Sequence, residues 1–312
     1  MITVAAPNPS IDKVLEVSAL QPGGIHRPHA QVAVPGGKGL NVARVAATLG
    51  AQVHVVGIAA GATGQWIARS LEEVGVPASW VWTDGENRSC TSVADATTNE
   101  LTEFYEPGPT ISDDAWAAFA ELVDKESSNG QWLALSGSLP PGVNERGLAT
   151  LVGPRDRRLA LDTSGEALRA TISASVDLVK LNTSETAELL GRTGPGDQEL
   201  IGLAAGLRRR CRPGSTVVVT GGQEGALMID PDGHMLRARL PIIGNYPVGS
   251  GDAFLAGLLT GNERGQSWAE ALRLATAVAG ANAEVPGAGL FDAQRVEDLL
   301  PLVNIEEEGR CE

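Results

Sequence analysis

The stretch NYPVGSGDAFLAGLL, residues 245–259, sets two glycines around a serine and follows them with an aspartate and an apolar run. A glycine cluster that opens a helix can direct several backbone N–H groups at one point, where the helix dipole also favours negative charge. Gly249, Ser250 and Gly251 would supply these donors. Asp252 would then lie at the cap or in the first turn, and an ordinary N-cap role is the alternative interpretation of this acid.

Short apolar runs of strand type alternate with helical patterns along the chain that leads to this stretch. ITVAA precedes GLNVARVAATLG, and VHVVGIA precedes GQWIARSLEEVG. WLALSG, LALDTS, DLVKLN and TVVVTG follow at intervals that leave room for helices. This alternation predicts an α/β fold in which helices cover both faces of a mostly parallel sheet. The C-terminal tail NIEEEGRCE is expected to be frayed.

Two segments, approximately residues 13–34 and 89–106, interrupt the alternation. Both alternate polar and apolar residues without a convincing helix, which predicts antiparallel strands outside the main sheet. We interpret them as a small β-sheet lid on the α/β body, although ordinary edge hairpins would give the same pattern. The chain has no internal repeat and no low-complexity linker, so residues 1–312 are interpreted as a single domain that carries this lid.

The composition restricts the partners and the compartment. The 312 residues are 43% hydrophobic, enough for a sizeable core, and the formal net charge of −14 opposes a general nucleic-acid or anionic-membrane surface. The three cysteines lie far apart and form no CxxC pair, which disfavours a disulfide framework or a zinc site. The first residues have no signal-peptide pattern, and no uncharged apolar run reaches about 18 residues. These features predict a cytoplasmic protein without a nucleic-acid or membrane partner.

A second glycine cluster, VPGGKGLNVARVAATLG, also opens a predicted helix. Gly36, Gly37 and Gly39 would let the backbone approach a ligand closely. Lys38 adds a charge, and Asn41 could hydrogen-bond to hydroxyl groups. A turn with a solvated lysine is the alternative, but the chain has only four lysines and two of them lie in motifs. The patterns GxxxxGK[ST], GxGxxG, GxSxG and HExxH are absent, which excludes the usual phosphate-loop and dinucleotide motifs.

Six segments follow one another along the chain: NPSID, PGGKGLNVARVAATLG, LSGSLPPGV, KLNTSE, VVTGGQEGA and PVGSGDAFLAGL. In sequence and order they resemble the ribokinase-like PfkB family of sugar kinases, and the resemblance extends from Ile2 to Pro301. The GGKG form and the segment TEFYEPGP are similar to the branch of 1-phosphofructokinases and tagatose-6-phosphate kinases. One position departs from the family signature, because Tyr246 stands where Asn or Asp is usual. The resemblance implies a Rossmann-type three-layer αβα sandwich with a small β lid.

The resemblance implies that Asp252 is the general base, which takes the proton of the acceptor hydroxyl as that oxygen attacks the γ-phosphoryl group of ATP. The amides of Gly249, Ser250 and Gly251 would meet the developing charge. A carboxylate with an ordinary pKa is expected to suffice, because a loose transition state needs little help from a strong base.

For the nucleotide, the resemblance implies that Lys180 reaches the phosphates and that the NxxE pair Asn182 and Glu185 orders Mg²⁺. A capping arrangement with Thr183 and Ser184 as caps is the alternative interpretation of this pair. The turn glycines of VVTGGQEGA alone would indicate only a hairpin. The remaining residues implied at the ATP site are Thr220, Gly222, Gly225 and, in contact with adenine, Asn282.

For the acceptor, the resemblance implies that sugar hydroxyls bind to Asp12, Gly37 and Asn41. A solvated lid position is the alternative for each arginine of the lid segments, and a strand-end turn is the alternative for the serine of SGSLPPG. An uncovered lid edge predicts association into a homodimer. The other acceptor residues implied are Lys38, Arg27 and Arg88 for the sugar phosphate, and Ser138 for a hydroxyl contact.

The implied function is ATP-dependent phosphorylation of a phosphorylated ketohexose, with conversion of fructose 1-phosphate to fructose 1,6-bisphosphate preferred. Tagatose 6-phosphate, fructose 6-phosphate and an unphosphorylated sugar or nucleoside are the alternative acceptors. A sugar-phosphate sensor without turnover would not need Asp252 and Glu185 together, so the presence of both favours an enzyme.

Overall fold

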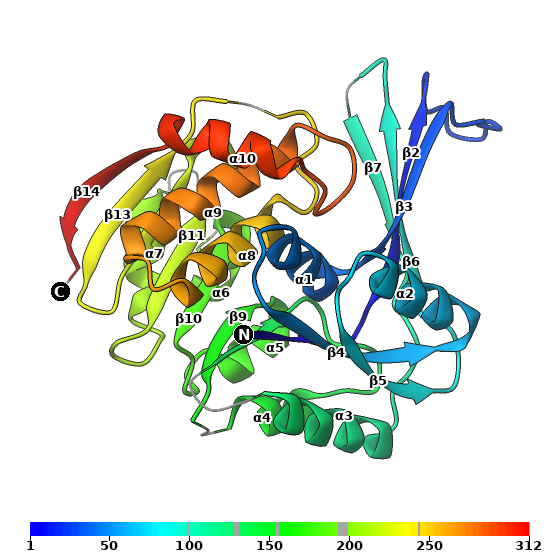
Figure 1. Cartoon of the computed structure of the whole chain (residues 1–312), viewed down its shortest axis with the longest axis horizontal. Coiled ribbons are helices and arrows are strands. Elements are labelled where there is room, and N and C mark those ends of the chain that lie inside the picture. The colour runs from blue at the N-terminus through cyan, green and yellow to red at the C-terminus, as the bar shows by residue number, and fades with distance from the viewer. Residues whose placement is uncertain (99, 128–130, 154–155, 193–198, 243, 312) are drawn as a thin grey trace.

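A ten-stranded sheet forms the body of the molecule (Figure 1). The computed structural model describes residues 1–312 except 99, 128–130, 154–155, 193–198, 243 and 312. Three strands at one edge of the sheet pair antiparallel, and the seven strands from there to the other edge are parallel to one another. The order is β14 (Asn304–Arg310), β13 (His234–Arg239), β12 (Ala226–Ile229), β11 (Thr216–Thr220), β10 (Leu178–Asn182), β9 (Arg158–Asp162), β8 (Trp132–Ser136), β1 (Ile2–Ala6), β4 (Val53–Ala60) and β5 (Ala78–Thr83).

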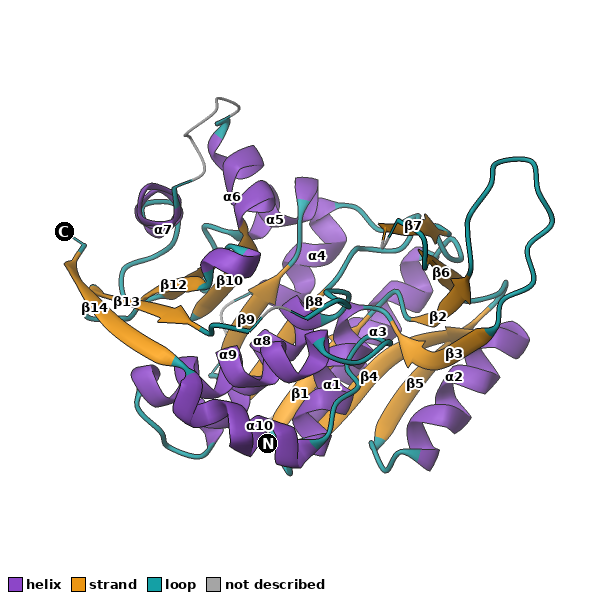
Figure 2. Cartoon of the chain, turned by 90° about the horizontal axis from the view of Figure 1, so that it is seen from above, coloured by secondary structure: helices purple, strands orange, loops and turns teal. Residues whose placement is uncertain are grey.

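Helices cover both faces of this sheet, and each face has its own hydrophobic core (Figure 2). One core contains residues of α1 (Lys38–Thr48), α2 (Gly61–Glu73), α8 (Ser250–Glu263), α9 (Trp268–Ala283) and α10 (Ala293–Leu299). The other contains residues of α3 (Asp113–Glu126), α4 (Glu145–Val152), α5 (Gly165–Thr171), α6 (Thr183–Leu190) and α7 (Leu200–Arg208). The predicted three-layer α/β architecture is confirmed.

The apolar runs explain why these segments become central strands. Every residue of ITVAA in β1 and of WLALS in β8 is buried, as expected for strands covered on both faces. Helices begin where a side chain can accept from the first N–H groups. The Oγ of Ser112 caps α3, and Ser267 and Glu270 form a capping box at the start of α9.

A separate four-stranded sheet projects from the body as a lid (Figure 1). Its order is β3 (Ala30–Gly36), β2 (Ser10–Val17), β6 (Arg88–Asp95) and β7 (Glu100–Tyr105). The outer pairs are antiparallel, but the central pair β2 and β6 is parallel, which the polar and apolar alternation did not indicate. Both central strands follow a parallel body strand, β1 and β5, and therefore enter the lid in the same direction.

The prediction of a frayed C-terminal tail was wrong. Residues Asn304–Arg310 form β14, which pairs with β13 at the edge of the sheet. Arg237 of β13 pairs with Glu308, and Arg239 pairs with Glu306 at 3.3 Å, so arginines of the neighbouring strand compensate the acidic run. None of the helices in the described ranges has the length and apolar character needed to cross a membrane.

Candidate active site

A pocket of about 510 Å³ lies between the lid and the carboxyl ends of the body strands. Gly137 and Ser164, which line it, follow β8 and β9, and ligands of open α/β sheets commonly bind at this edge. Most of the residues predicted for the site are brought together here. Those that line the pocket are Asp12, Gly37, Lys38, Asn41, Arg88, Ser138, Glu185, Gly249, Gly251 and Asp252.

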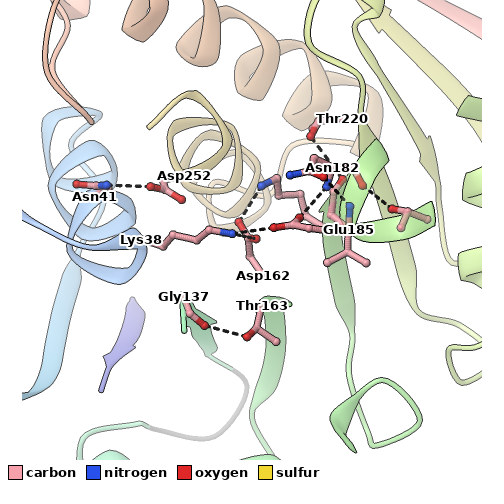
Figure 3. A network of polar contacts seen from close by, with 12 residues as sticks. Lys38, Asn41, Gly137, Asp162, Thr163, Asn182, Glu185, Thr220 and Asp252 are labelled. Atoms are coloured by element: carbon pink, nitrogen blue, oxygen red, sulfur yellow. Dashed lines mark hydrogen bonds and ion pairs between the residues drawn. The ribbon is translucent and has the colours of Figure 1, made fainter. Parts of the chain in front are cut away.

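Helix α8 begins at the pocket. Its N-cap is Gly249, whose φ of 80° lies in the left-handed region, and no side chain caps the helix. A Cβ on Gly249 would lie 2.7 Å from the Cα of Ala288, so the backbone conformation and the neighbouring turn both require glycine. Asp252 is therefore not the N-cap. Its Oδ2 instead accepts a hydrogen bond of 2.9 Å from the Nδ2 of Asn41 in α1 (Figure 3).

One of the three predicted loop donors is engaged inside the protein. The N–H of Ser250 donates to the carbonyl oxygen of Pro247 at 3.1 Å, and its Oγ accepts from Asn282. Gly249 and Gly251 line the pocket, whereas Ser250 does not. The expectation that all three amides meet the developing charge is therefore corrected: only the amides of Gly249 and Gly251 are left for it.

Asp252 lies where an ionised carboxylate is disfavoured. The residue is 5% exposed. Burial is the main cause that raises the pKa of Asp252 to about 7, and the charge of Asp162 adds to it. Lys38, Lys180 and the hydrogen bond from Asn41 act in the opposite direction. The expectation of an ordinary pKa was wrong, and a carboxyl group that titrates near neutral pH is suited to proton transfer.

A buried aspartate for which no motif predicts a role lies between two lysines that were predicted at the site (Figure 3). Asp162, at the end of β9, is fully buried and accepts from the Nζ of Lys38 at 3.1 Å and from the Nζ of Lys180 at 2.8 Å. Burial by itself would raise the pKa of Asp162, but the two ammonium groups outweigh it and hold the pKa below its usual range. The signal was present in LALDTS, where an acid ends a buried parallel strand.

The ammonium group of Lys38 is already paired inside the protein, unlike that of a lysine that is free to bind phosphate. Its Nζ also lies 3.2 Å from the Oε1 of Glu185, so the ammonium group contacts two carboxylates. The negative charge of Asp162 is the main cause that raises the pKa of Lys38 above its usual range. Lys180 is buried beside the glycine loop, because a Cβ on Gly251 would come 2.9 Å from its Nζ.

The NxxE pair forms a capping box, with Asn182 as the cap rather than Thr183 or Ser184. The Oδ1 of Asn182 accepts from the N–H of Glu185 at 2.8 Å, and the Oε2 of Glu185 accepts from the N–H of Asn182 at 3.0 Å. The other oxygen of Glu185 contacts Lys38. Glu185 thus completes the capping box of α6 and also presents negative charge to the pocket.

The carboxylate of Asp12 lies beside the N-terminus of α1. Its Oδ1 accepts from the Oγ of Ser10 at 2.6 Å, and its Oδ2 accepts from the N–H of Gly37 at 3.1 Å. A Cβ on Gly36 would fall 2.1 Å from the Cγ of Asp12, so only glycine leaves room for this carboxylate. The motifs NPSID and GGKG therefore form one unit at the pocket.

Asn8 connects the lid with the body at the edge of the pocket. Its carbonyl oxygen accepts from the Nε and one terminal nitrogen of Arg88 at 3.3 and 3.2 Å, and its Nδ2 donates to the Oγ of Ser138 at 3.3 Å. Arg88 and Ser138 are thereby brought together. Arg27 is not, because it is exposed on the loop between β2 and β3 and does not line the pocket.

Thr220, Gly222 and Gly225 lie at the turn between β11 and β12. The N–H of Gly221 donates to the carbonyl oxygen of Gly225 at 2.8 Å, which closes the hairpin. Gly222 and Gly225 have φ angles of 59° and 83°, so the turn accounts for both glycines. None of the three residues lines the pocket.

The expectation that Asn282 contacts adenine is corrected. Asn282 is fully buried. Its Nδ2 donates to the carbonyl oxygen of Val248 at 3.0 Å and to the Oγ of Ser250 at 3.1 Å, and its Oδ1 accepts from the N–H of Gly289 at 2.7 Å. Because both donors and the acceptor are used inside the protein, Asn282 holds the glycine loop against the turn at Gly289 instead of meeting a ligand.

Comparisons with known proteins agree with this arrangement. The model of one protein family, pfkB family carbohydrate kinase, matches residues 6–294. The chain is 32% identical to the 1-phosphofructokinase of Haloferax volcanii over 302 residues, which cover 96% of this chain and 95% of the relative. It is also 32% identical to the ATP-dependent 6-phosphofructokinase isozyme 2 of Escherichia coli over 284 residues, which cover 88% of this chain and 89% of the relative.

Solved structures show the same fold. The phosphofructokinase-2 of Escherichia coli in complex with substrates and products has a TM-score of 0.87 at 29% identity, covering 96% of this chain and 98% of that one. The Arabidopsis thaliana ribokinase complexed with ribose and ATP has a TM-score of 0.70 at 21% identity, with 96% of this chain and 98% of that one covered. The predicted ribokinase-like fold with a lid sheet is therefore confirmed.

Proposed function

Because this chain belongs to the pfkB family of carbohydrate kinases, we propose that it transfers the γ-phosphoryl group of ATP to a phosphorylated ketohexose. The proposed acceptor is fructose 1-phosphate, which becomes fructose 1,6-bisphosphate. The observation that carries the proposal is the buried carboxyl group of Asp252, which faces a pocket that also contains Asp12 and Arg88. The relative from Haloferax volcanii supports fructose 1-phosphate, whereas the equal identity to the Escherichia coli enzyme favours fructose 6-phosphate as the second candidate.

In the proposed reaction Asp252 accepts the proton of the acceptor hydroxyl as the hydroxyl oxygen bonds to the γ-phosphorus and the bond to the ADP oxygen breaks. The Oδ2 of Asp252 is occupied by Asn41, so Oδ1 is left for the hydroxyl. The N–H groups of Gly249 and Gly251, at the positive end of α8, stabilise the charge on the transferring group.

On the acceptor side, Asp12 binds sugar hydroxyls and Ser138 makes a further hydroxyl contact. The contacts predicted for Gly37 and Asn41 are not retained, because the polar groups of both residues are used inside the protein. Arg88 holds the sugar phosphate, because its guanidinium lines the pocket and hydrogen-bonds only to carbonyl oxygens among the described residues. Lys38 already contacts two carboxylates and supplies positive charge between the phosphosugar and the nucleotide.

On the donor side, we propose that ATP lies along the ends of β10 and β11, with Lys180, Asn182, Thr220, Gly222 and Gly225 at its border. Among the described residues no group of three or more His, Cys, Asp or Glu side chains could hold a metal ion. Mg²⁺ commonly uses one or two carboxylates together with nucleotide phosphates, and Glu185 is the proposed ligand because it lines the pocket; Mg²⁺ would compete there with the Nζ of Lys38, which lies 3.2 Å from Oε1. Mg²⁺ would neutralise phosphate charge, so a chelator should abolish turnover.

The proposal is tested by a coupled assay of ADP release over a panel of acceptors. The panel contains fructose 1-phosphate, tagatose 6-phosphate, fructose 6-phosphate, free fructose and ribose. We expect the highest kcat/KM for fructose 1-phosphate. A tenfold preference for another phosphosugar, a gap of about 1.4 kcal/mol, would change the assigned acceptor, and a preference for a free sugar would contradict the phosphosugar assignment.

Arg88→Met is expected to lower kcat/KM for the preferred phosphosugar about ten- to a hundredfold, and to leave the small rate on free fructose nearly unchanged. A charge-assisted hydrogen bond to phosphate contributes roughly 1.5 to 3 kcal/mol, and only the phosphosugar can make it. Arg69→Met is the matched control, since Arg69 is exposed on α2 outside the pocket. Equal losses on both acceptors would contradict a phosphate-binding role.

The acid limb of kcat/KM is expected to have its midpoint near pH 7, because burial raises the pKa of Asp252 to about 7 and only the ionised form can accept a proton. Below this midpoint the rate should fall tenfold per pH unit. An enzyme that keeps full kcat/KM down to pH 5 would rule out Asp252 as the titrating base.

The lid supports a homodimer. Phe104 and Tyr105 on β7 are each 60% exposed, and Ile25 on the loop between β2 and β3 is 87% exposed. Apolar side chains on a sheet that leaves its outer strands unpaired favour association with a second copy. Sedimentation should give the mass of two chains at micromolar concentration, and a one-chain mass with and without ligands would contradict the dimer.

A further inference from the structure

Arg44 is a buried charged residue for which the proposed chemistry has no role. It lies in α1, one helical turn after Asn41, and is 5% exposed. Asp12 and Asp252 are close enough for their charges to act on it, yet no carboxylate of the described residues forms an ion pair with its guanidinium. A buried cation is costly unless other contacts compensate it. The contacts of Arg44 therefore indicate what it does.

The first contact fixes the amide of Asn41. A terminal nitrogen of Arg44 donates to the Oδ1 of Asn41 at 2.8 Å. Because arginine can only donate, the amide oxygen must face Arg44, and the NH₂ group must face Asp252. The Nδ2 of Asn41 indeed donates to the Oδ2 of Asp252 at 2.9 Å. Arg44 thus ensures that the carboxylate meets a donor rather than a second oxygen.

The second contact holds the turn that packs on the glycine loop. The same nitrogen of Arg44 donates to the carbonyl oxygen of Ala288 at 2.6 Å, and the other terminal nitrogen donates to that of Gly289 at 3.4 Å. Ala288 lies so close to Gly249 that a Cβ on Gly249 would fall 2.7 Å from the Cα of Ala288. One guanidinium therefore supports the base and the loop from the same side.

We propose that Arg44 is a positioning residue for Asp252. Arg44 acts through the Asn41 amide and leaves Oδ1 of the Asp252 carboxylate for the acceptor hydroxyl. The proposal rests on the proposed function, in which Asp252 takes the proton. Without Arg44 the Asn41 amide can rotate, and an oxygen that faces Asp252 favours the protonated carboxyl group. The charged groups that also face Asp252 stay in place in such a variant; they are Lys38 of α1, Lys180 of β10 and Asp162 of β9.

The test is the pH profile of kcat/KM for Arg44→Met. Loss of one hydrogen bond to the ionised carboxylate should raise the midpoint of the acid limb by about one pH unit, which lowers kcat/KM at pH 6 about tenfold. Arg44→Lys, which restores one donor, should recover part of the shift. Arg157→Met is the matched control, because Arg157 is also buried but is bonded to Asp124 and Leu151 away from the pocket, and this variant should lower only the melting temperature.

The double variant of Arg44→Met with Asn41→Ala distinguishes an effect through the Asn41 amide from a general loss of packing. In the Asn41→Ala background, Arg44→Met should move the midpoint clearly less than in the unaltered protein, because only the direct effect of the arginine charge on Asp252 remains. An unchanged midpoint in Arg44→Met, or an equal shift in both backgrounds, would overturn the proposal. If Arg44→Met does not fold, Arg44→Gln and Arg44→Lys carry the same comparison.

A ¹³C NMR titration of the Asp252 carboxyl group reads the midpoint without turnover, so it keeps the two proposals apart. Lack of phosphosugar turnover in the unaltered chain would contradict the proposed function. A carboxyl titration that does not change in the Arg44 variants would contradict the positioning role, whatever the substrate.

Discussion

Replacing Asp252 with asparagine is expected to lower kcat at least about a hundredfold and to leave nucleotide binding largely intact. The substitution keeps the shape of the side chain and an oxygen that can accept from Asn41, but it removes the group that takes the proton. Burial and the charge of Asp162 disfavour an ionised carboxylate at this position. The neutral side chain should therefore not lower the melting temperature at neutral pH, which separates a catalytic from a structural role.

Asp230→Asn provides the control for this substitution. Asp230 is buried in the turn between β12 and β13, where it accepts from the N–H groups of Asp232 and His234. The same chemical change remote from the pocket should leave kcat unchanged and cost some stability. If Asp252→Asn kept a kcat close to that of the unaltered enzyme, Asp252 would have only a structural role.

The body of the fold could be predicted because its strands carry local signals. A strand buried on both faces is a continuous apolar run, as in ITVAA, and the helix that follows restores a longer period. The strand β14 gave no such signal, because NIEEEGR is mostly polar. It forms only where β13 supplies the pairing edge and arginines that face its glutamates, and this information lies far away in the sequence.

Part of the site could be predicted for the same reason. The glycines before Asp252, and Gly36 and Gly37 in the loop that lies beside Asp12, indicate places where the backbone must approach something closely. The partners of these acids could not be read from spacing, since Asn41 and Asp252 are 211 residues apart. Asn282 shows the opposite error: the family resemblance implied a contact with adenine, but the fold buries this side chain.

The electrostatics of the site depend entirely on the tertiary structure. The pKa of Asp252 follows from its burial and from the charge of Asp162, neither of which a motif reveals. Asp162 itself ends a strand run that looked like core. Only the parallel order of β9 and β10 brings it next to Lys180, and α1 brings Lys38 to the same carboxylate.

Asp162 is accordingly expected to matter most for stability. Asp162→Asn should lower the free energy of unfolding at pH 7 by about 3 to 5 kcal/mol, measured by urea denaturation, because it leaves the buried ammonium of Lys180 without its carboxylate. The substitution affects Lys38 less than Lys180, because the side chain of Lys38 is 37% exposed and keeps its ion pair with Glu185. Glu188→Gln is the control: Glu188 pairs with Arg169 at the surface, and this substitution should cost no more than about 1 kcal/mol.

The pH dependence of this loss distinguishes the ion pair from a packing defect. The two lysines hold the pKa of Asp162 below its usual range in the folded state, so the carboxylate stabilises the fold fully above the unfolded value of about 3.9. That contribution disappears as the pH falls through the folded-state pKa. The unfolding curves of the variant and the unaltered protein should therefore converge in acid. A loss that is independent of pH, or one no larger than that of Glu188→Gln, would contradict the buried ion pair as its cause.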